Sequence, residues 1–229
     1  MRVGLLVAAA GPGRRLGRDV PKGLVEVAGV PLIVRTLRRF ECVDLVEGAV
    51  VLAPPAHREA FQKVLSESFP GSAVRVFEGG GERQVSVAKG LAAFDDDTDL
   101  VAIHDAARPF IEEQAIRDVI AAARTTGAAT VATPCVDTIL ESDDDGMLAA
   151  TPNRSRLWAC QTPQVFGLAL IREAHEKARE FGVWYTDDAT LVRASGHEVK
   201  IVAGPAGNIK ITTVSDLAFA EYLIREGAV

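Results

Sequence analysis

The chain has 229 residues, of which 48% are hydrophobic and 24% charged, a composition typical of a globular protein with a sizeable core. Its formal net charge of -6 argues against a general nucleic-acid binder, because such proteins usually carry basic surface that displaces counterions from phosphates. No apolar run approaches the roughly 18 residues that a membrane span needs. We therefore expect one compact α/β domain over residues 1–229, with neither nucleic acid nor membrane as a partner.

The cysteines indicate a reducing compartment. Cys42, Cys135 and Cys160 form no CxxC pair and leave an odd count, which does not suit a disulfide framework. We expect a cytoplasmic protein whose thiols are structural. The apolar run at residues 3–7 is too short for a signal peptide and leads directly into a loop rich in glycine and arginine, so it is expected to be a strand.

The next elements alternate between strands and helices. Short apolar runs bounded by turn-forming residues predict buried strands at 3–9, 49–52, 74–77, 100–104 and 128–133. Apolar residues at three- and four-residue spacing predict helices at 31–40, 57–68 and 111–126. Because parallel neighbours need a long crossover, this order predicts a Rossmann-like, mainly parallel sheet flanked by helices. Ligands should then bind in the loops that follow the strands, after Ala9, Phe77 and His104.

The region of about residues 136–160 interrupts this alternation. Asp143-Asp144-Asp145-Gly146 is a turn signal between two modestly apolar stretches, which predicts a protruding β-hairpin arm. A lone hairpin is rarely stable, so we expect the arm to serve in dimerisation. Helical patterns return at 168–181 and 187–195, followed by a strand at 199–203 and a closing helix near 214–227.

The strongest chemical signal lies directly after the first predicted strand, in A-A-A-G-P-G-R-R-L-G at residues 8–17, with Pro21-Lys22 downstream. Glycines let backbone N–H groups approach phosphate oxygens, and Arg15 and Lys22 add positive charge. Leu16 stands where a dinucleotide-binding motif needs glycine, and the chain has no Gly-Lys-Ser/Thr of a P-loop. The loop therefore indicates another kind of polyphosphate site, the alternative being a plain turn with solvated basic residues.

This A-A-G-x-G-x-R loop with its downstream P-K is similar to the signature loop of sugar-phosphate nucleotidyltransferases. Further segments resemble, in order, the pattern of the 2-C-methyl-D-erythritol 4-phosphate cytidylyltransferase family: Gly80 to Ser86, His104 to Pro109, Thr162 to Gln164, Thr186 to Ala189 and Asn208 to Lys210. The resemblance covers nearly the whole chain. It implies cytidylyl transfer from CTP to the polyol phosphate with Mg²⁺ present, releasing pyrophosphate, as a step of the non-mevalonate isoprenoid pathway.

The resemblance also implies roles for individual residues. Arg15 and Lys22 would neutralise the triphosphate and its transition state, while Arg154 and Lys210 would hold the attacking phosphate, since the reaction must bring two anions together. The nucleotide would be bound by Ala8, Ala9, Gly11, Gly13, Gly80, Gly81 and Ser86. The polyol phosphate would be bound by Asp105, Arg108, Thr138 and Thr162. Asp105 is also a candidate metal ligand, with Mg²⁺ held mainly by the CTP phosphates.

Two of these residues, Thr138 and Arg154, fall inside the predicted arm. In the family the corresponding arm reaches into the active site of the partner subunit, so the resemblance implies a homodimer with composite sites. The sequence departs from the family pattern at Gly81 and at Gly207, where many members have Asp. The second departure leaves an additional acidic metal ligand near Lys210 in doubt.

Two other functions fit parts of the pattern. A ribitol-5-phosphate cytidylyltransferase would place a different polyol on the same scaffold, but Asn153-Arg154, Leu157-Trp158 and the segment 161–164 favour methylerythritol phosphate. A non-catalytic nucleotide-sensing module would need only the glycine-rich loop. Cationic residues on both the leaving and the attacking side argue against such a module. His104 and Ser86 also have structural interpretations, as a packed neighbour of Asp105 and as a helix-start hydroxyl.

Overall fold

The computed structural model describes residues 1–11, 20–41, 43 and 46–228. In this part of the chain, seven strands form one sheet in the order β11-β7-β10-β6-β1-β4-β5. Six of them run in the same direction, and β10 is antiparallel to both of its neighbours. The strands are β1 (Val3–Ala8), β4 (Val46–Ala53), β5 (Val74–Glu78), β6 (Leu100–Asp105), β7 (Ala128–Pro134), β10 (Trp158–Gly167) and β11 (Lys200–Ala203). The mainly parallel α/β sheet expected from the sequence is confirmed.

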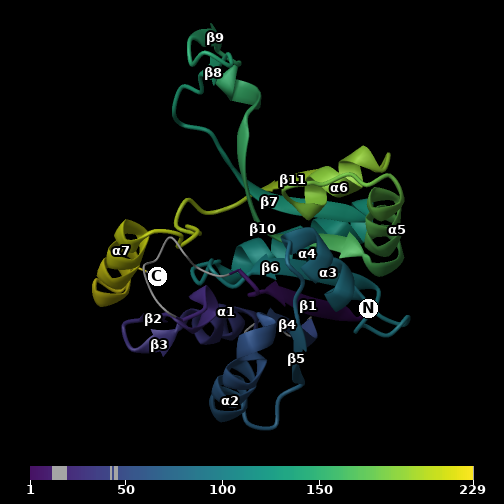
Figure 1. Cartoon of the computed structure of the whole chain (residues 1–229), viewed down its shortest axis with the longest axis vertical. Helices are drawn as coiled ribbons and strands as arrows, with labels where there is room; N and C mark the ends of the chain where they lie inside the picture. The colour runs from purple at the N-terminus through teal and green to yellow at the C-terminus, as the bar shows by residue number, and fades with distance from the viewer. Residues whose placement is uncertain (12–19, 42, 44–45, 229) are drawn as a thin grey trace.

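Helices cover both faces of this sheet (Figure 1). One face packs against α1 (Leu32–Glu41), α2 (Arg58–Ser68) and α4 (Glu113–Thr126). The other packs against α3 (Arg83–Leu91), α5 (Leu168–Glu180) and α6 (Asp188–Ala194). Because successive side chains of a strand point to opposite faces, Leu5 and Val7 of β1 join the first layer and Leu6 the second. Strands covered on both faces read as unbroken apolar runs, which explains why the sequence identified them.

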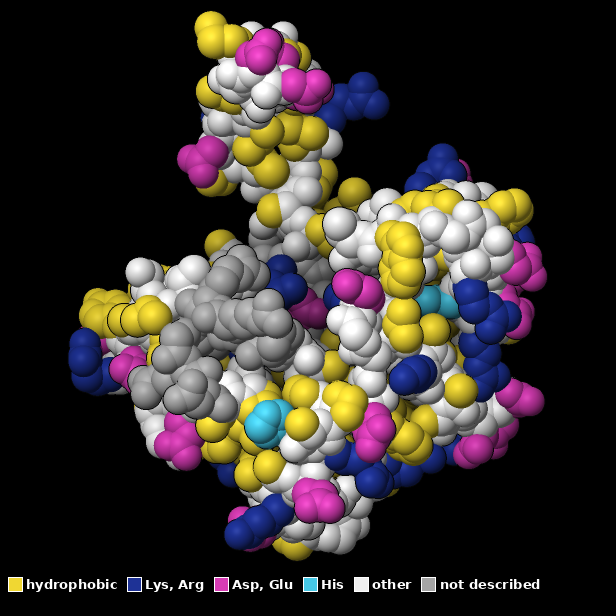
Figure 2. Space-filling model, in the orientation of Figure 1, with side chains coloured by type: hydrophobic (Ala, Val, Ile, Leu, Met, Phe, Trp, Pro, Cys, Tyr) yellow, Lys and Arg dark blue, Asp and Glu magenta, His cyan; other side chains and the backbone are white. Residues whose placement is uncertain are grey.

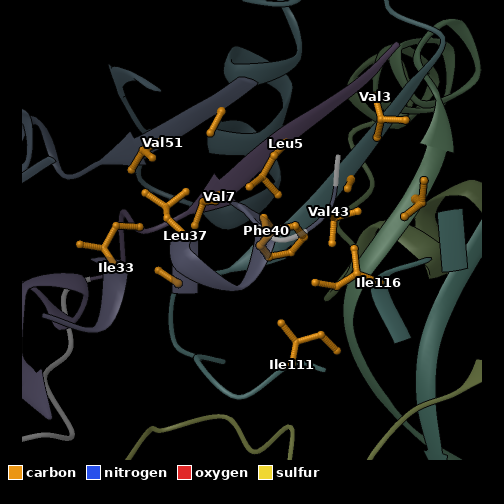
Figure 3. Close-up of a cluster of buried hydrophobic side chains, with 14 of the residues drawn as sticks. Val3, Leu5, Val7, Ile33, Leu37, Phe40, Val43, Val51, Ile111 and Ile116 are labelled. Atoms are coloured by element: carbon orange, nitrogen blue, oxygen red, sulfur yellow. The ribbon is translucent and has the colours of Figure 1, made fainter. Parts of the chain in front are cut away.

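The larger buried cluster lies between the sheet and α1, α2 and α4 (Figure 3). Val7 of β1, Leu37 of α1 and Ile116 of α4 are each at most 3% exposed. Burying one such side chain contributes about 1.5–3 kcal/mol relative to leaving it in water. This packing fixes the carboxyl end of β1, where the glycine-rich loop begins.

Four helices and strands were not predicted, namely α3, the short paired strands β2 (Glu26–Val27) and β3 (Val30–Pro31), and the interior strand β10. The pairing of β10 with β7 is interrupted between Cys160 and Gln164. Pro163 lies in that interruption, where it does not need to donate a ladder hydrogen bond. Helix α1 also begins one residue after Pro31, which ends β3.

The predicted hairpin is present as β8 (Glu141–Ser142) and β9 (Leu148–Ala150), followed by the short 3-10 helix η4 (Arg154–Arg156). This arm stands away from the rest of the molecule (Figure 1). Its apolar side chains are exposed, including Val136 at 80% and Leu148 at 64%, and hydrophobic atoms cover much of its surface in the space-filling view (Figure 2). Such exposure is typical of a surface that binds another protein. It agrees with dimerisation through the arm, which remains a prediction.

The chain ends with α7 (Val214–Arg225), which lies apart from the main sheet (Figure 1). Thr213 and Asp216 form a capping box that satisfies backbone N–H groups at the start of this helix. Leu217 packs with Val25 and Val27 in a third buried cluster. No helix in the described residues is long and apolar enough to cross a membrane.

Candidate active site

A pocket opens beside the carboxyl ends of β1 and β6, in the position that the topology predicted. Loops that follow β1, β5 and β6 supply most of its wall, and the segment before α7 supplies Lys210. The pocket brings together nine of the residues proposed from the sequence: Ala8, Ala9, Gly11, Lys22, Gly80, Gly81, Ser86, Asp105 and Lys210.

Among the other proposed residues, two are not described and two lie on the arm. Gly13 and Arg15 fall outside the described residues. Thr138 and Arg154 are exposed on the arm, where the Arg154 guanidinium donates to the carbonyl oxygen of Val136 at 2.8 Å. Neither of them lines the pocket of its own chain.

The loop after β5 is held by its own helix. Ser86 of α3 is 2% exposed, and its hydroxyl accepts the N–H of Gly80 at 2.8 Å and donates to the carbonyl of Glu82 at 2.9 Å. A Cβ on Gly79 would lie 2.4 Å from the Cβ of Ala10, so the loops after β1 and β5 approach too closely for any other residue. The structure therefore gives the Ser86 hydroxyl a structural task, and its contact with nucleotide remains a prediction.

Asp105, the last residue of β6, is the acidic centre of the pocket. Its Oδ2 lies 2.6 Å from Nζ of Lys210, and its Oδ1 lies 3.4 Å from Nε of Arg83. Burial opposes the charge of the carboxylate, but Arg83 and Lys210 outweigh burial and hold the pKa of Asp105 well below its ordinary range. Asp105 is therefore ionised at neutral pH and fixed between two cations.

Arg83 continues this ion-pair chain away from the pocket. Its Nη1 lies 2.7 Å from Oδ2 of Asp188, whose Oδ1 lies 3.2 Å from Nε2 of His175. Burial alone would lower the pKa of Arg83, but the two carboxylates raise it above its ordinary value. Arg83 and Asp188 lie inside segments recognised from the sequence, yet sequence reasoning assigned neither a role because it could not show that they meet.

A second chain of hydrogen bonds supports Asp105 from beneath. The backbone N–H of Asp105 donates to Oγ1 of Thr162 at 3.1 Å, and that hydroxyl lies 3.0 Å from Nδ1 of His104. Nε2 of His104 lies 3.0 Å from the carbonyl oxygen of Arg108, so Nε2 carries the proton and Nδ1 accepts from Thr162. Burial lowers the pKa of His104 from 6.5 to about 4, which keeps the ring neutral. The structural role expected for His104 matches this geometry.

Arg108 holds the loop that carries Lys210. Its guanidinium donates to the carbonyls of Asn208 at 2.7 Å and Cys160 at 3.2 Å. The buried Asn208 amide donates in turn to the carbonyl of Thr162 at 2.9 Å. Arg108 and Thr162 were expected to bind substrate, and in the structure their side chains bind backbone groups around Asp105 and Lys210.

The described residues contain no group of three His, Cys, Asp or Glu side chains that could hold a metal ion. The carboxylate of Asp105 faces the pocket, but both of its oxygens already contact cationic side chains. Mg²⁺ usually keeps several waters and binds through substrate phosphates with one or two carboxylates. The pocket therefore fits an ion that arrives with a nucleotide, and Mg²⁺ remains a prediction.

The pocket is suited to a phosphate-rich ligand, since Lys22 and Lys210 line it together with glycine loops. In the space-filling view, basic and acidic side chains gather in a hollow below the arm (Figure 2). The model of the 2-C-methyl-D-erythritol 4-phosphate cytidylyltransferase family matches residues 3–226. The chain belongs to this family.

Individual members of the cytidylyltransferase family match over almost the full length. The 2-C-methyl-D-erythritol 4-phosphate cytidylyltransferase of Desulforamulus reducens is 41% identical over 221 residues, which covers 96% of this chain and 94% of the relative. The crystal structure of the same enzyme from Thermus thermophilus superposes with a TM-score of 0.81 at 36% identity, covering 98% of this chain and 100% of that one. The 4-diphosphocytidyl-2C-methyl-D-erythritol synthase of Anaerococcus prevotii gives a TM-score of 0.88 at 30% identity, covering 98% and 96%. These matches confirm the predicted family, fold class and nucleotidyltransferase activity.

Proposed function

We propose that this pocket transfers the cytidylyl group of CTP to 2-C-methyl-D-erythritol 4-phosphate, giving 4-CDP-2-C-methyl-D-erythritol and pyrophosphate. The observation that carries the proposal is that Lys22, Lys210 and Asp105 line one pocket with the glycine loops after β1 and β5. The names of the relatives support the choice of substrates.

The chemistry requires positive charge more than proton transfer. An oxygen of the polyol phosphate attacks the α-phosphorus of CTP, the bond from that phosphorus to the bridging oxygen breaks, and pyrophosphate leaves with the electron pair. Because the nucleophile is already an anion, the barrier lies in bringing two phosphates together and stabilising the charge of the reacting group. Mg²⁺ bound to the triphosphate would supply part of that charge.

The two lysines of the pocket divide this work. Lys22 follows the glycine-rich loop and is assigned to the triphosphate together with Arg15. Lys210 approaches from the segment before α7 and is assigned to the attacking phosphate. Asp105 holds the Lys210 ammonium at 2.6 Å until that phosphate arrives to share it.

Cytosine and ribose are assigned to the backbone of residues 8–11 and 80–81. Fixed main-chain donors and acceptors can reject a purine by size and another pyrimidine by leaving polar groups unpaired. The tight contact of Gly79 with Ala10 and the hydroxyl of Ser86 hold these loops in register.

The arm of a second copy is assigned to complete the site. Thr138 and Arg154 lie on an exposed arm away from the pocket of their own chain, and the apolar side chains of the arm need a partner surface. In such a homodimer, a mixture of Lys22→Ala and Arg154→Ala chains would form hybrids with one intact site. We expect mixing to restore part of the turnover that each variant lacks alone, and mixtures as inactive as either parent would refute the composite site.

Pyrophosphate release tests the function directly. The wild-type chain is incubated with CTP and either 2-C-methyl-D-erythritol 4-phosphate or ribitol 5-phosphate, and release is expected with the former. Exclusive use of ribitol phosphate would overturn the substrate, and CTP binding without release would indicate a nucleotide sensor. Lys22→Ala should lower the rate by about 100- to 1000-fold, as for loss of one preorganised charge, whereas Lys63→Ala on exposed α2 should not change it.

A further inference from the structure

The reaction proposed above gives no task to Arg83, although this residue lines the pocket. Its guanidinium lies between two carboxylates from distant parts of the sequence, Asp105 at the end of β6 and Asp188 at the start of α6. Asp105 is 7% exposed and Asp188 only 1%. Buried carboxylates are strongly unfavourable without a paired cation, and Arg83 is the cation that contacts both of these carboxylates.

Asp188 anchors Arg83 on the side away from the pocket. Its Oδ2 accepts from Nη1 of Arg83 at 2.7 Å, and His175 lies 3.2 Å from its other oxygen. The backbone N–H groups of Asp188 and Ala189 both donate to Oε1 of Gln164 at 3.0 Å. Gln164 therefore holds the backbone of Asp188 and His175 contacts its carboxylate, so that this carboxylate can hold the guanidinium in one orientation.

Asp105 transmits that orientation to the pocket. Its Oδ1 faces Nε of Arg83 at 3.4 Å, and its Oδ2 binds the ammonium of Lys210 at 2.6 Å. The side chain of Lys210 is 42% exposed, whereas that of Asp105 is 10% exposed, so the buried carboxylate is the fixed member of this pair. A lysine side chain has many rotamers, so an ammonium at the edge of a pocket needs such a partner to stay in one place.

We propose that Arg83 is a positioning residue for cytidylyl transfer, which holds Asp105 so that Asp105 fixes Lys210 where the attacking phosphate binds. The inference rests on the proposed function and adds a residue to it. Arg83 acts through Lys210 and does not itself contact the nucleotide. Its replacement should therefore leave nucleotide binding unchanged.

A double-mutant cycle tests this coupling. Pyrophosphate release is measured for wild type, Arg83→Gln, Lys210→Ala and the double variant, and the dissociation constant for CTP is measured by calorimetry without polyol phosphate. Arg83→Gln should lower kcat/KM for the polyol phosphate by about 10- to 100-fold, the range for groups that orient a ligand-binding residue. The dissociation constant for CTP should stay unchanged. In the Lys210→Ala background, Arg83→Gln should cost little more, because the residue through which it acts is gone.

Arg83→Lys separates charge from geometry. A single ammonium cannot replace Nε and Nη1, which face different carboxylates, so we expect a loss as large as for Arg83→Gln. Arg172 provides a matched control, because it is also partly buried, binding the carbonyls of Leu91 and Phe94 and the carboxylate of Asp96 away from the pocket. Arg172→Lys should leave kcat/KM unchanged.

Two results would overturn the inference. Losses that multiply in the double variant would show that Arg83 acts independently of Lys210, and weaker CTP binding by Arg83→Gln would show a direct nucleotide contact. If thermal melting shows that Arg83→Gln does not fold, Asp188→Asn replaces it as the test. This variant removes the charge that anchors Arg83 but keeps the shape of the side chain, and it must give the same non-additive loss with Lys210→Ala. Failure of the wild-type chain to release pyrophosphate would refute the proposed function, whereas additive losses in an active enzyme refute only the role of Arg83.

Discussion

Replacing His104 with glutamine should flatten the dependence of stability on pH. The ring is fully buried, and its Nε2–H donates to the carbonyl of Arg108 while Nδ1 accepts from Thr162. Glutamine can still place an N–H near the Arg108 carbonyl, but it does not titrate. The substitution therefore removes the proton-binding site and keeps one of the two hydrogen bonds.

The size and sign of the effect follow from the two pKa values. Burial lowers the pKa of His104 from 6.5 to about 4 in the folded chain. Between these two pH values the unfolded chain binds a proton that the folded chain does not, so the free energy of unfolding rises with pH. The contribution of His104 to stability is therefore present above pH 6.5 and is lost as the pH falls from 6.5 towards 4. The full difference corresponds to about 3 kcal/mol, of which about 2 kcal/mol is already lost at about pH 5.

Urea unfolding of wild type and His104→Gln at about pH 7.5 and about pH 5 measures this contribution. Other groups titrate equally in both proteins, so the comparison isolates one ring. The wild type should lose about 2 kcal/mol more than the variant between the two conditions. Parallel losses in the two proteins would refute a neutral, buried His104 and the hydrogen-bond chain inferred from it.

Three further substitutions probe the surroundings of the pocket. Asp105→Asn leaves Arg83 and Lys210 without their shared carboxylate. Because Lys210 is partly solvated, we expect the free energy of unfolding to fall by about 1–3 kcal/mol. A melting temperature equal to that of wild type would contradict this expectation. Thr162→Val leaves the buried N–H of Asp105 without an acceptor and should cost about 1–3 kcal/mol in urea unfolding, a cost that would be absent if water replaced the hydroxyl. Gly79→Ala places a methyl group 2.4 Å from the Cβ of Ala10 and should raise KM for CTP. Gly48→Ala is the control, because its methyl group meets only Ala73, at 3.4 Å, and should leave KM unchanged. Equal KM values for the two variants would show that the loops can move apart to fit the added methyl group.

The fold was predictable where burial on both faces of the sheet leaves a simple apolar run, as at residues 3–9 and 100–104. Strand β10 was not, because three polar buried side chains precede its two buried apolar residues, Val165 and Phe166. Gln161, Thr162 and Gln164 are each at most 7% exposed, yet they bind backbone and side-chain groups around the pocket. Polar residues in the buried part of a strand leave too short an apolar run to identify that strand from the sequence.

The site was predictable in part for a similar reason. Residues in loops after parallel strands meet at one edge of the sheet, so Lys22, Asp105 and the glycines could be placed together from the sequence. Arg83 and Asp188 are 105 positions apart, and only the fold shows that they form an ion pair. Arg154 could be matched to a family position from the sequence, but its own chain places it on the arm, so its role depends on a second copy.

The reversed direction of β10 determines where the arm is attached. The chain leaves the sheet at the carboxyl end of β7 and returns at the start of β10. Because these two strands are antiparallel, both attachment points lie at the end of the sheet where the parallel strands finish. The carboxyl ends of β1 and β6, where the pocket lies, are at the same end of the sheet. A parallel strand in the place of β10 would have forced the chain to re-enter from the opposite end. The arm is therefore anchored to the sheet at the Pro134–Trp158 pair, on the same strand that places Thr162 against the backbone of Asp105.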